Sequence, residues 1–99
     1  MKLIVAIVRP FTIEKIVVAL EEIEGFPGIT VSDTEGFGQR LHANIDDALN
    51  PFKPNKRIEI VAEEEMVEPI IASIKEHAHT GRKGDGFAVV LKIEGSILI

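Results

Sequence analysis

The chain has 99 residues, a hydrophobic content of 45% and a net charge of -5, values that suit one soluble domain with a single core. It contains no Cys, which excludes a disulfide framework, a thiolate metal site and a cysteine nucleophile. The acidic balance and the lack of Trp and Tyr argue against nucleic-acid binding, which depends on clustered cations and stacking aromatics.

The chain opens with apolar residues at every position from 3 to 8. Such a run is typical of a strand that is buried on both faces. It is too short to span a bilayer and lacks the small-residue cleavage site of a signal peptide, so we expect a cytoplasmic protein.

A helix and a second strand are predicted next. Thr12 is a candidate N-cap, and apolar residues recur at helical spacing from there through Ile23. Gly and Pro residues at 25–28 end this helix. Residues 29–32 then predict a strand that runs toward a Gly-Phe-Gly sequence.

Residues 39–55 are predicted to form a flexible loop, because these 17 residues carry two prolines and no sustained periodicity. Loops of this length are uncommon in compact domains and are usually functional or mobile. The segment has no Ser, Thr or Tyr, which excludes phosphorylation or uridylylation of a loop hydroxyl. Control of the loop would have to come from a ligand that orders it.

The second half of the chain predicts a strand over residues 56–62, a helix, and a strand over residues 87–93. Pro69 is tolerated only in the first turn of that helix, which places the helix start near Glu65 or Met66. The apolar face of the helix consists of Val67, Ile70, Ile71, Ile74 and Ala78.

The predicted order β-α-β-loop-β-α-β indicates a single α+β domain over residues 1–99, with the ferredoxin-like double βαβ fold: one antiparallel four-stranded sheet and two helices on one face. Both alternating sets of side chains in the first strand are apolar, yet two helices can cover only one face of the sheet. An exposed apolar face is an association liability, so we expect the protein to self-associate.

The sequence Thr80-Gly81-Arg82-Lys83-Gly84-Asp85-Gly86 joins the second helix to the last strand. Its glycines allow a tight turn with closely spaced N–H groups, and its two cations favour a phosphate or another small anion. The alternative is a plain turn, in which Gly81 ends the helix and Asp85-Gly86 begin the strand. The order of the surrounding elements favours the anion site.

Other polar residues give weaker indications. His77 and His79 are two positions apart and do not share a helix face, and we predict no metal ligands from them or from His42. Glu59 lies in an apolar strand near a Lys and an Arg, so it forms an ion pair or contacts a ligand, and we favour the ligand. No nucleophile–base arrangement is apparent, so we predict no catalytic residues and a binding and signalling module rather than an enzyme.

Taken in order, these segments resemble the PII signal-transduction proteins, and the resemblance covers essentially the whole chain. It is carried by Arg9-Pro10-Phe11, Gly28-Ile29-Thr30-Val31, Gly36-Phe37-Gly38, the long loop, Lys56-Arg57-Ile58-Glu59, and Thr80-Gly81 with Gly84-Asp85-Gly86. It implies a homotrimer that binds adenine nucleotides in clefts between subunits. It also implies that loop 39–55 is the T-loop, which docks on target proteins.

The resemblance further implies which residues contact the nucleotide. The adenine and ribose would lie near Ile7, Thr30, Gly36, Phe37, Gly38, Glu59 and Val61. The phosphates would meet the backbone N–H groups of Gly84, Asp85 and Gly86, and Arg40, Arg82 and Lys83 would supply additional positive charge. We expect no required cofactor.

The chain departs from the family where the phosphates would bind. Phe87 and Asn55 each replace a Lys, and the tail 95–99 lacks a pair of arginines. The order Gln39-Arg40 is inverted, which puts the family's magnesium and 2-oxoglutarate ligand in doubt. Each lost cation removes a charge-assisted hydrogen bond of about 1.5–3 kcal/mol, so we expect ADP, AMP or a non-nucleotide anion to bind better than ATP.

Two alternatives keep the same fold. One is a divergent PII-like trimer that senses a non-nucleotide ligand, such as bicarbonate or a metal, and is linked to carbon or metal transport. The other is a structural trimer without a small ligand. The expected partners are the nucleotide or anion, the other subunits and a target protein, for which a membrane transporter is one candidate.

Overall fold

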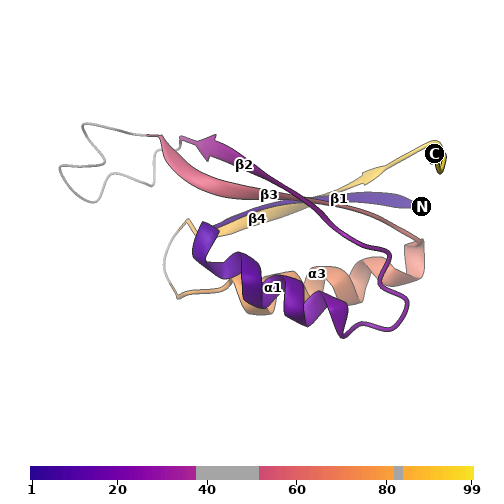
Figure 1. Cartoon of the computed structure of the whole chain (residues 1–99), viewed down its shortest axis with the longest axis horizontal. Helices are drawn as coiled ribbons and strands as arrows, with labels where there is room; N and C mark the ends of the chain where they lie inside the picture. Colours follow the sequence, from indigo (N-terminus) through magenta and orange to yellow (C-terminus); the bar gives the residue numbers. More distant parts are fainter. Residues whose placement is uncertain (38–51, 82–83) are drawn as a thin grey trace.

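The computed structural model describes residues 1–37, 52–81 and 84–99. Within these residues, one antiparallel sheet of four strands packs its lower face in Figure 1 against helices α1 and α3. The elements in chain order are β1 (Lys2–Val8), the 3-10 helix η1 (Pro10–Thr12), α1 (Ile13–Glu21), β2 (Thr30–Gly36), β3 (Lys53–Ala62), α3 (Glu64–Ala78) and β4 (Gly86–Lys92). The ferredoxin-like α+β fold predicted from the sequence is confirmed.

The apolar strand β1 lies inside the sheet, whose strand order is β2-β3-β1-β4. It pairs antiparallel with β3 on one side and with β4 on the other, so that Ile4 is opposite both Ile60 and Val90. Strands β2 and β4 are the two edges. The central position agrees with the absence of polar residues in β1 after Lys2, because both of its edges are paired and one of its faces packs against the helices.

The core lies between the sheet and the two helices. Alternate residues of β1 and β3 face the helices and are buried there, together with the apolar stripe of each helix. The members of this core are Ile4, Ala6, Val8, Ile16, Leu20, Ile58, Ile60, Ala62, Ile70, Ile74 and Ala78. Neither α1 nor α3, the α-helices of the described residues, is long and apolar enough to cross a bilayer.

The opposite side of the sheet carries no helix (Figure 1). We call this side the open face and define it by Leu3, Val5, Ile7, Val61, Phe87, Val89 and Leu91, which alternate with the core positions and pair across β3, β1 and β4. Phe87 is 62% exposed, and Val89 and Leu91 are each 44% exposed. The predicted apolar face is therefore present and uncovered in the single chain.

The two helix starts compare differently with the prediction. Thr12 is the N-cap residue of α1, as predicted, but its hydroxyl makes no capping hydrogen bond and donates one of 2.8 Å to the Arg9 carbonyl instead. Helix α3 begins at Glu64, which puts Pro69 in the second turn and not in the first. Pro69 has no N–H to donate to the carbonyl four residues earlier, that of Glu65.

The strands that flank the long loop are longer than the sequence indicated. Strand β2 continues to Gly36 and β3 begins at Lys53, and these two residues pair with each other. The predicted loop therefore ends before Lys53 and not at Asn55, because backbone pairing with β2 recruits the intervening residues into the sheet. The part of this loop up to residue 51 lies outside the described residues.

Candidate functional site

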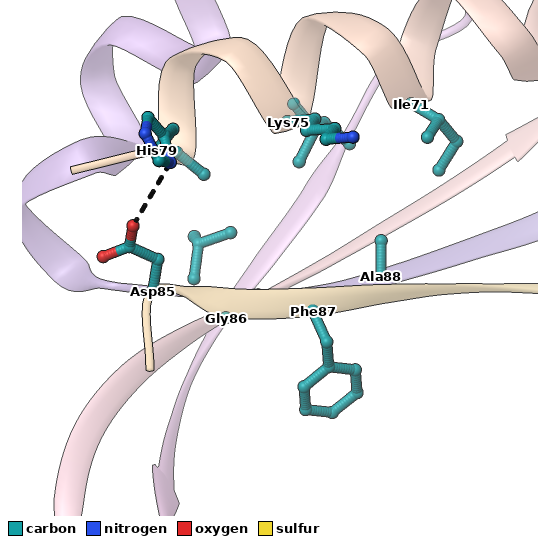
Figure 2. A pocket seen from close by; sticks show the side chains of 10 residues that line it. Ile71, Lys75, His79, Asp85, Gly86, Phe87 and Ala88 are labelled. Atoms are coloured by element: carbon teal, nitrogen blue, oxygen red, sulfur yellow. Dashed lines mark ion pairs between the residues drawn. The ribbon is translucent and has the colours of Figure 1, made fainter. Parts of the chain in front are cut away.

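The segment between α3 and β4 is held at its ends by Asp85. The Thr80 backbone N–H donates a hydrogen bond of 2.7 Å to Asp85 Oδ2, and the Thr80 hydroxyl donates another to Asp85 Oδ1. His79 Nδ1 lies 3.7 Å from Asp85 Oδ2 (Figure 2). These contacts tie the two ends of the loop together. Arg82 and Lys83, predicted to add positive charge here, lie outside the described residues.

The Asp85 carboxylate is stabilised in its charged form. The hydrogen bonds from the Thr80 side chain and backbone hold the pKa of Asp85 below its ordinary value, and electrostatic interactions with His79 and Arg9 act in the same direction. Partial burial opposes this shift but does not reverse it. Asp85 is therefore an anion at neutral pH, and both of its carboxylate oxygens accept hydrogen bonds from Thr80 within the loop.

Each described glycine of this loop has a conformational reason to be there. Gly81 and Gly84 have φ values of +83° and +78°, which L side chains rarely adopt. Gly86 presses on β1, because a Cβ at this position would lie 2.0 Å from the Ile7 carbonyl oxygen. Helix α3 ends at Ala78 and is followed by extended backbone at His79, so Gly81 does not end the helix as the plain-turn interpretation required.

Four of the predicted adenine and ribose contacts lie on the side of the sheet that the helices leave uncovered. Ile7 and Val61 belong to the open face, and Thr30 of β2 pairs with Glu59 of β3 beside it. Arg57 Nε lies 3.4 Å from Glu59 Oε1. The ion pair considered for this carboxylate is therefore formed.

Gly36 and Phe37 lie at the end of β2, which is the edge strand on the opposite side of the sheet from β4. The Phe37 ring packs against Phe52, with ring centroids 5.8 Å apart. This contact was not predicted from the sequence. The available indication was one phenylalanine just before the predicted loop and another near its end. Gly38 and Arg40, the remaining predicted contacts of this segment, lie outside the described residues.

Within one chain, the predicted phosphate contacts lie far from the predicted adenine contact Gly36. Gly84–Gly86 lie at edge strand β4, whereas Gly36 lies on edge strand β2, and β3 and β1 separate these strands. Neighbouring strands are about 4.8 Å apart, so β2 and β4 are about 14 Å apart. Among the described adenine contacts, Ile7 is the one that lies directly against the loop, at Gly86.

A pocket of about 340 Å³ lies on the helix side of the sheet, between α3 and β4. Figure 2 shows Ile71, Lys75 and His79 along the side of α3 that overlooks β4. The remaining lining residues are Val8, Ile74, Ala78, Asp85, Gly86, Phe87 and Ala88. This pocket was not predicted from the sequence. It lies where the small side chain of Ala88 is opposite helix α3, and these two segments are not adjacent along the chain.

The histidines of α3 and its C-terminal end have local partners. His77 Nδ1 lies 2.8 Å from the Ser73 carbonyl oxygen one turn earlier in the helix, and His79 faces Asp85. Over residues 1–37, 52–81 and 84–99, no group of three or more His, Asp or Glu side chains could hold a metal ion. His42 lies outside these residues.

Comparison with known proteins places this sequence in one family. The family model for Nitrogen regulatory protein P-II matches residues 1–99. Similar curated proteins, each named Nitrogen regulatory protein P-II, come from Azospirillum brasilense (40% identical), Bradyrhizobium diazoefficiens (42%) and Rhodospirillum rubrum (42%). Each alignment spans 103 positions and covers 100% of this chain and 91% of the relative.

The alignments also bear on chain length and on the kind of activity. Because 103 aligned positions exceed the 99 residues of this chain, at least four residues of each relative have no counterpart here. The names describe regulators and not enzymes, in agreement with the expectation from the sequence. The chain belongs to the nitrogen regulatory protein P-II family.

Proposed function

We propose that this regulator binds an adenine nucleotide in clefts between the subunits of a homotrimer and controls a target protein through the loop predicted over residues 39–55. The observation that carries the proposal is the division of the candidate site. Ile7 and Glu59 lie on the open side of the sheet, Gly84–Gly86 at one edge and Gly36 at the other. A second copy of the chain is needed to bring such groups around one ligand.

The apolar surface of the chain supports the oligomer. The open face combines exposed Val89 and Leu91 with the apolar residues of β1. Strand β4 is also an edge strand, and an exposed apolar edge strand is a ready site for pairing with another chain. Association of copies through this surface would remove it from water.

The chemistry of the loop supports a preference for ADP or AMP over ATP. Asp85 is negative and already engaged by Thr80, so it adds repulsion and no attraction for phosphate oxygens. Phe87, the first residue after the glycine-rich loop, contributes no charge. The backbone N–H groups of Gly84–Gly86 would then be the main phosphate contacts, and they compensate fewer negative charges than a triphosphate carries.

Calorimetric titration with ATP, ADP and AMP, with and without Mg²⁺, tests the proposal. We expect ADP or AMP to bind more tightly than ATP. Substitution Phe87→Lys should strengthen ATP binding by about tenfold or more, because it adds a charge-assisted contact to phosphate. Val18→Lys, which adds the same charge at an exposed position of α1, should leave all three affinities unchanged. Tight, Mg²⁺-dependent ATP binding by the unmodified chain would contradict the preference.

A thermal-shift panel distinguishes the two alternatives that share this fold. A ligand that binds the folded state raises Tm according to its free concentration relative to Kd. Stabilisation by bicarbonate or by a divalent metal, with no response to nucleotides, would identify a divergent sensor. A flat panel would identify a structural trimer and would exclude the nucleotide proposal.

A further inference from the structure

We propose that the pocket between α3 and β4 binds a small organic acid with an apolar body, whose carboxylate is received by Lys75. The proposal does not rest on nucleotide binding, although the pocket shares Asp85 and Gly86 with the predicted phosphate contacts. The pocket lies on the helix side of the sheet, whereas Ile7 and Val61 lie on the opposite side. Figure 2 shows the Phe87 ring pointing away from the pocket, toward that opposite side.

The shape and lining of the pocket suit a small apolar body. Its volume of about 340 Å³ lies in the range of small-molecule sites, about 300–1,000 Å³. Ile71, Ile74 and Ala78 form the wall from α3, and Val8 and Ala88 form the floor from the sheet. The Ala88 methyl group faces α3 in Figure 2, and a larger residue at this position would fill the space.

The charges around the pocket select an anion. The charged and titratable groups that line it are Lys75, His79 and Asp85. The Asp85 carboxylate accepts two hydrogen bonds from Thr80 and faces His79. By contrast, none of the ion pairs formed among the described residues includes Lys75. The positive charge without a partner at the pocket is therefore that of Lys75, and a carboxylate is its natural complement.

Titration of the ¹⁵N-labelled full chain with hexanoate and with hexanamide, followed by NMR, tests the inference. The two probes have the same apolar body, and only hexanoate is charged. We expect shifts at Ile71, Ala78 and Ala88, with hexanoate binding at least about fivefold more tightly than hexanamide. Lys75→Gln should remove this preference, because it deletes the charge at an exposed site. Lys15→Gln, at an exposed position of α1, should preserve it.

A second variant tests the shape of the site. Ala88→Leu should weaken both probes by tenfold or more, because the added side chain occupies the pocket floor. Its folding is checked by the NMR spectrum, and Ala72→Leu, at an exposed position of α3, is the control. Equal affinities for hexanoate and hexanamide would overturn the proposal. So would shifts confined to Val89 and Leu91 on the open face, unchanged preference in the Lys75 variant, or undetectable binding of both probes at millimolar concentration.

Discussion

Among the described glycines, Gly86 is the one where an added Cβ would meet the closest neighbour. Its φ of +136° disfavours any L side chain, and the carbonyl of Ile7 occupies the space that a Cβ would need. The close approach fixes the start of β4 against β1. Gly86 is thus required by the packing of two strands, whether or not a phosphate also meets its N–H group.

Substitution Gly86→Ala should lower the free energy of unfolding by at least about 2 kcal/mol, through backbone strain and overlap with Ile7. Urea denaturation followed by circular dichroism measures the change. Gly95→Ala is the matched control, since a Cβ at Gly95 meets nothing within 4 Å. The control should remain within about 0.5 kcal/mol of the unmodified chain, and a similar loss in both variants would contradict the steric explanation.

Asp85 gives the loop a predictable dependence on pH. Its pKa in the folded state is lowered, chiefly by Thr80, so the carboxylate contributes stability above its ordinary pKa, and this contribution is lost as pH falls through the folded value. Asp85→Asn should cost about 1–3 kcal/mol at pH 7, and the difference from the unmodified chain should shrink below about pH 4.

Urea denaturation at several pH values between 7 and 3 measures this difference. Asp33→Asn is the control, because Asp33 forms an exposed ion pair with Lys56, and such pairs contribute at most about 1 kcal/mol. A loss at Asp85→Asn that stays constant down to pH 3 would show that the carboxylate charge is unimportant.

At the scale of elements, α3 contains an interior proline, Pro69, whose position in the helix was predicted incorrectly from the sequence. The first-turn position expected for Pro69 assumed that the helix avoids an interior proline. The structure begins the helix earlier, at Glu64, and the turn after Pro69 buries Ile70 and Ile74 in the core at 0% and 4% exposure. Burial of the apolar stripe outweighs one missing backbone hydrogen bond.

Pro69→Ala should therefore stabilise the protein by about 1 kcal/mol or more, because it restores a donor for the Glu65 carbonyl and removes ring crowding. Thermal unfolding measures the gain as a higher Tm. Glu68→Ala, a neighbouring exposed substitution in the same helix, should change stability by less than about 0.5 kcal/mol. A lower Tm for Pro69→Ala would show that restriction of the unfolded chain by proline is the larger effect.

Strands β1, β2 and β3 show why some elements were predictable and others only in part. The continuous apolar run of β1 predicted its burial directly. The seven residues TVSDTEG of β2 carry no sustained apolar pattern and are mostly exposed, so only pairing with β3 identifies residues 33–36 as a strand. Lys53–Asn55 joined the predicted loop because Pro51 precedes the segment and Pro54 lies within it. Here β3 pairs with β2 and not with β1, and a strand that is paired on one side tolerates a proline.

At the scale of the whole molecule, the open face is the surface through which we propose that copies of the chain associate. Val89 lies on its edge strand β4, opposite Val5 of β1. Val89→Lys should weaken self-association by at least tenfold, because association would bury an unpaired ammonium group. Sedimentation equilibrium measures the shift from three times the chain mass of 10.9 kDa toward a single copy.

Val18→Lys is the control for this shift, because Val18 is 59% exposed on α1, away from the open face. Its self-association should equal that of the unmodified chain. A chain that sediments as a monomer before any substitution would contradict the assembly, and dissociation by both variants would move the interface to another surface.

The sequence by itself determined the order of elements, the helical stripes, the doubly apolar β1 and the family, because periodicity and glycine placement are local properties of the chain. Only the tertiary structure decided which residues share a face, and it did so through strand register. It showed that Asp85 closes the loop with Thr80, that Gly86 is required by Ile7, and that Ala88 leaves a pocket beneath α3. These features depend on contacts between segments far apart in sequence, which no local pattern specifies.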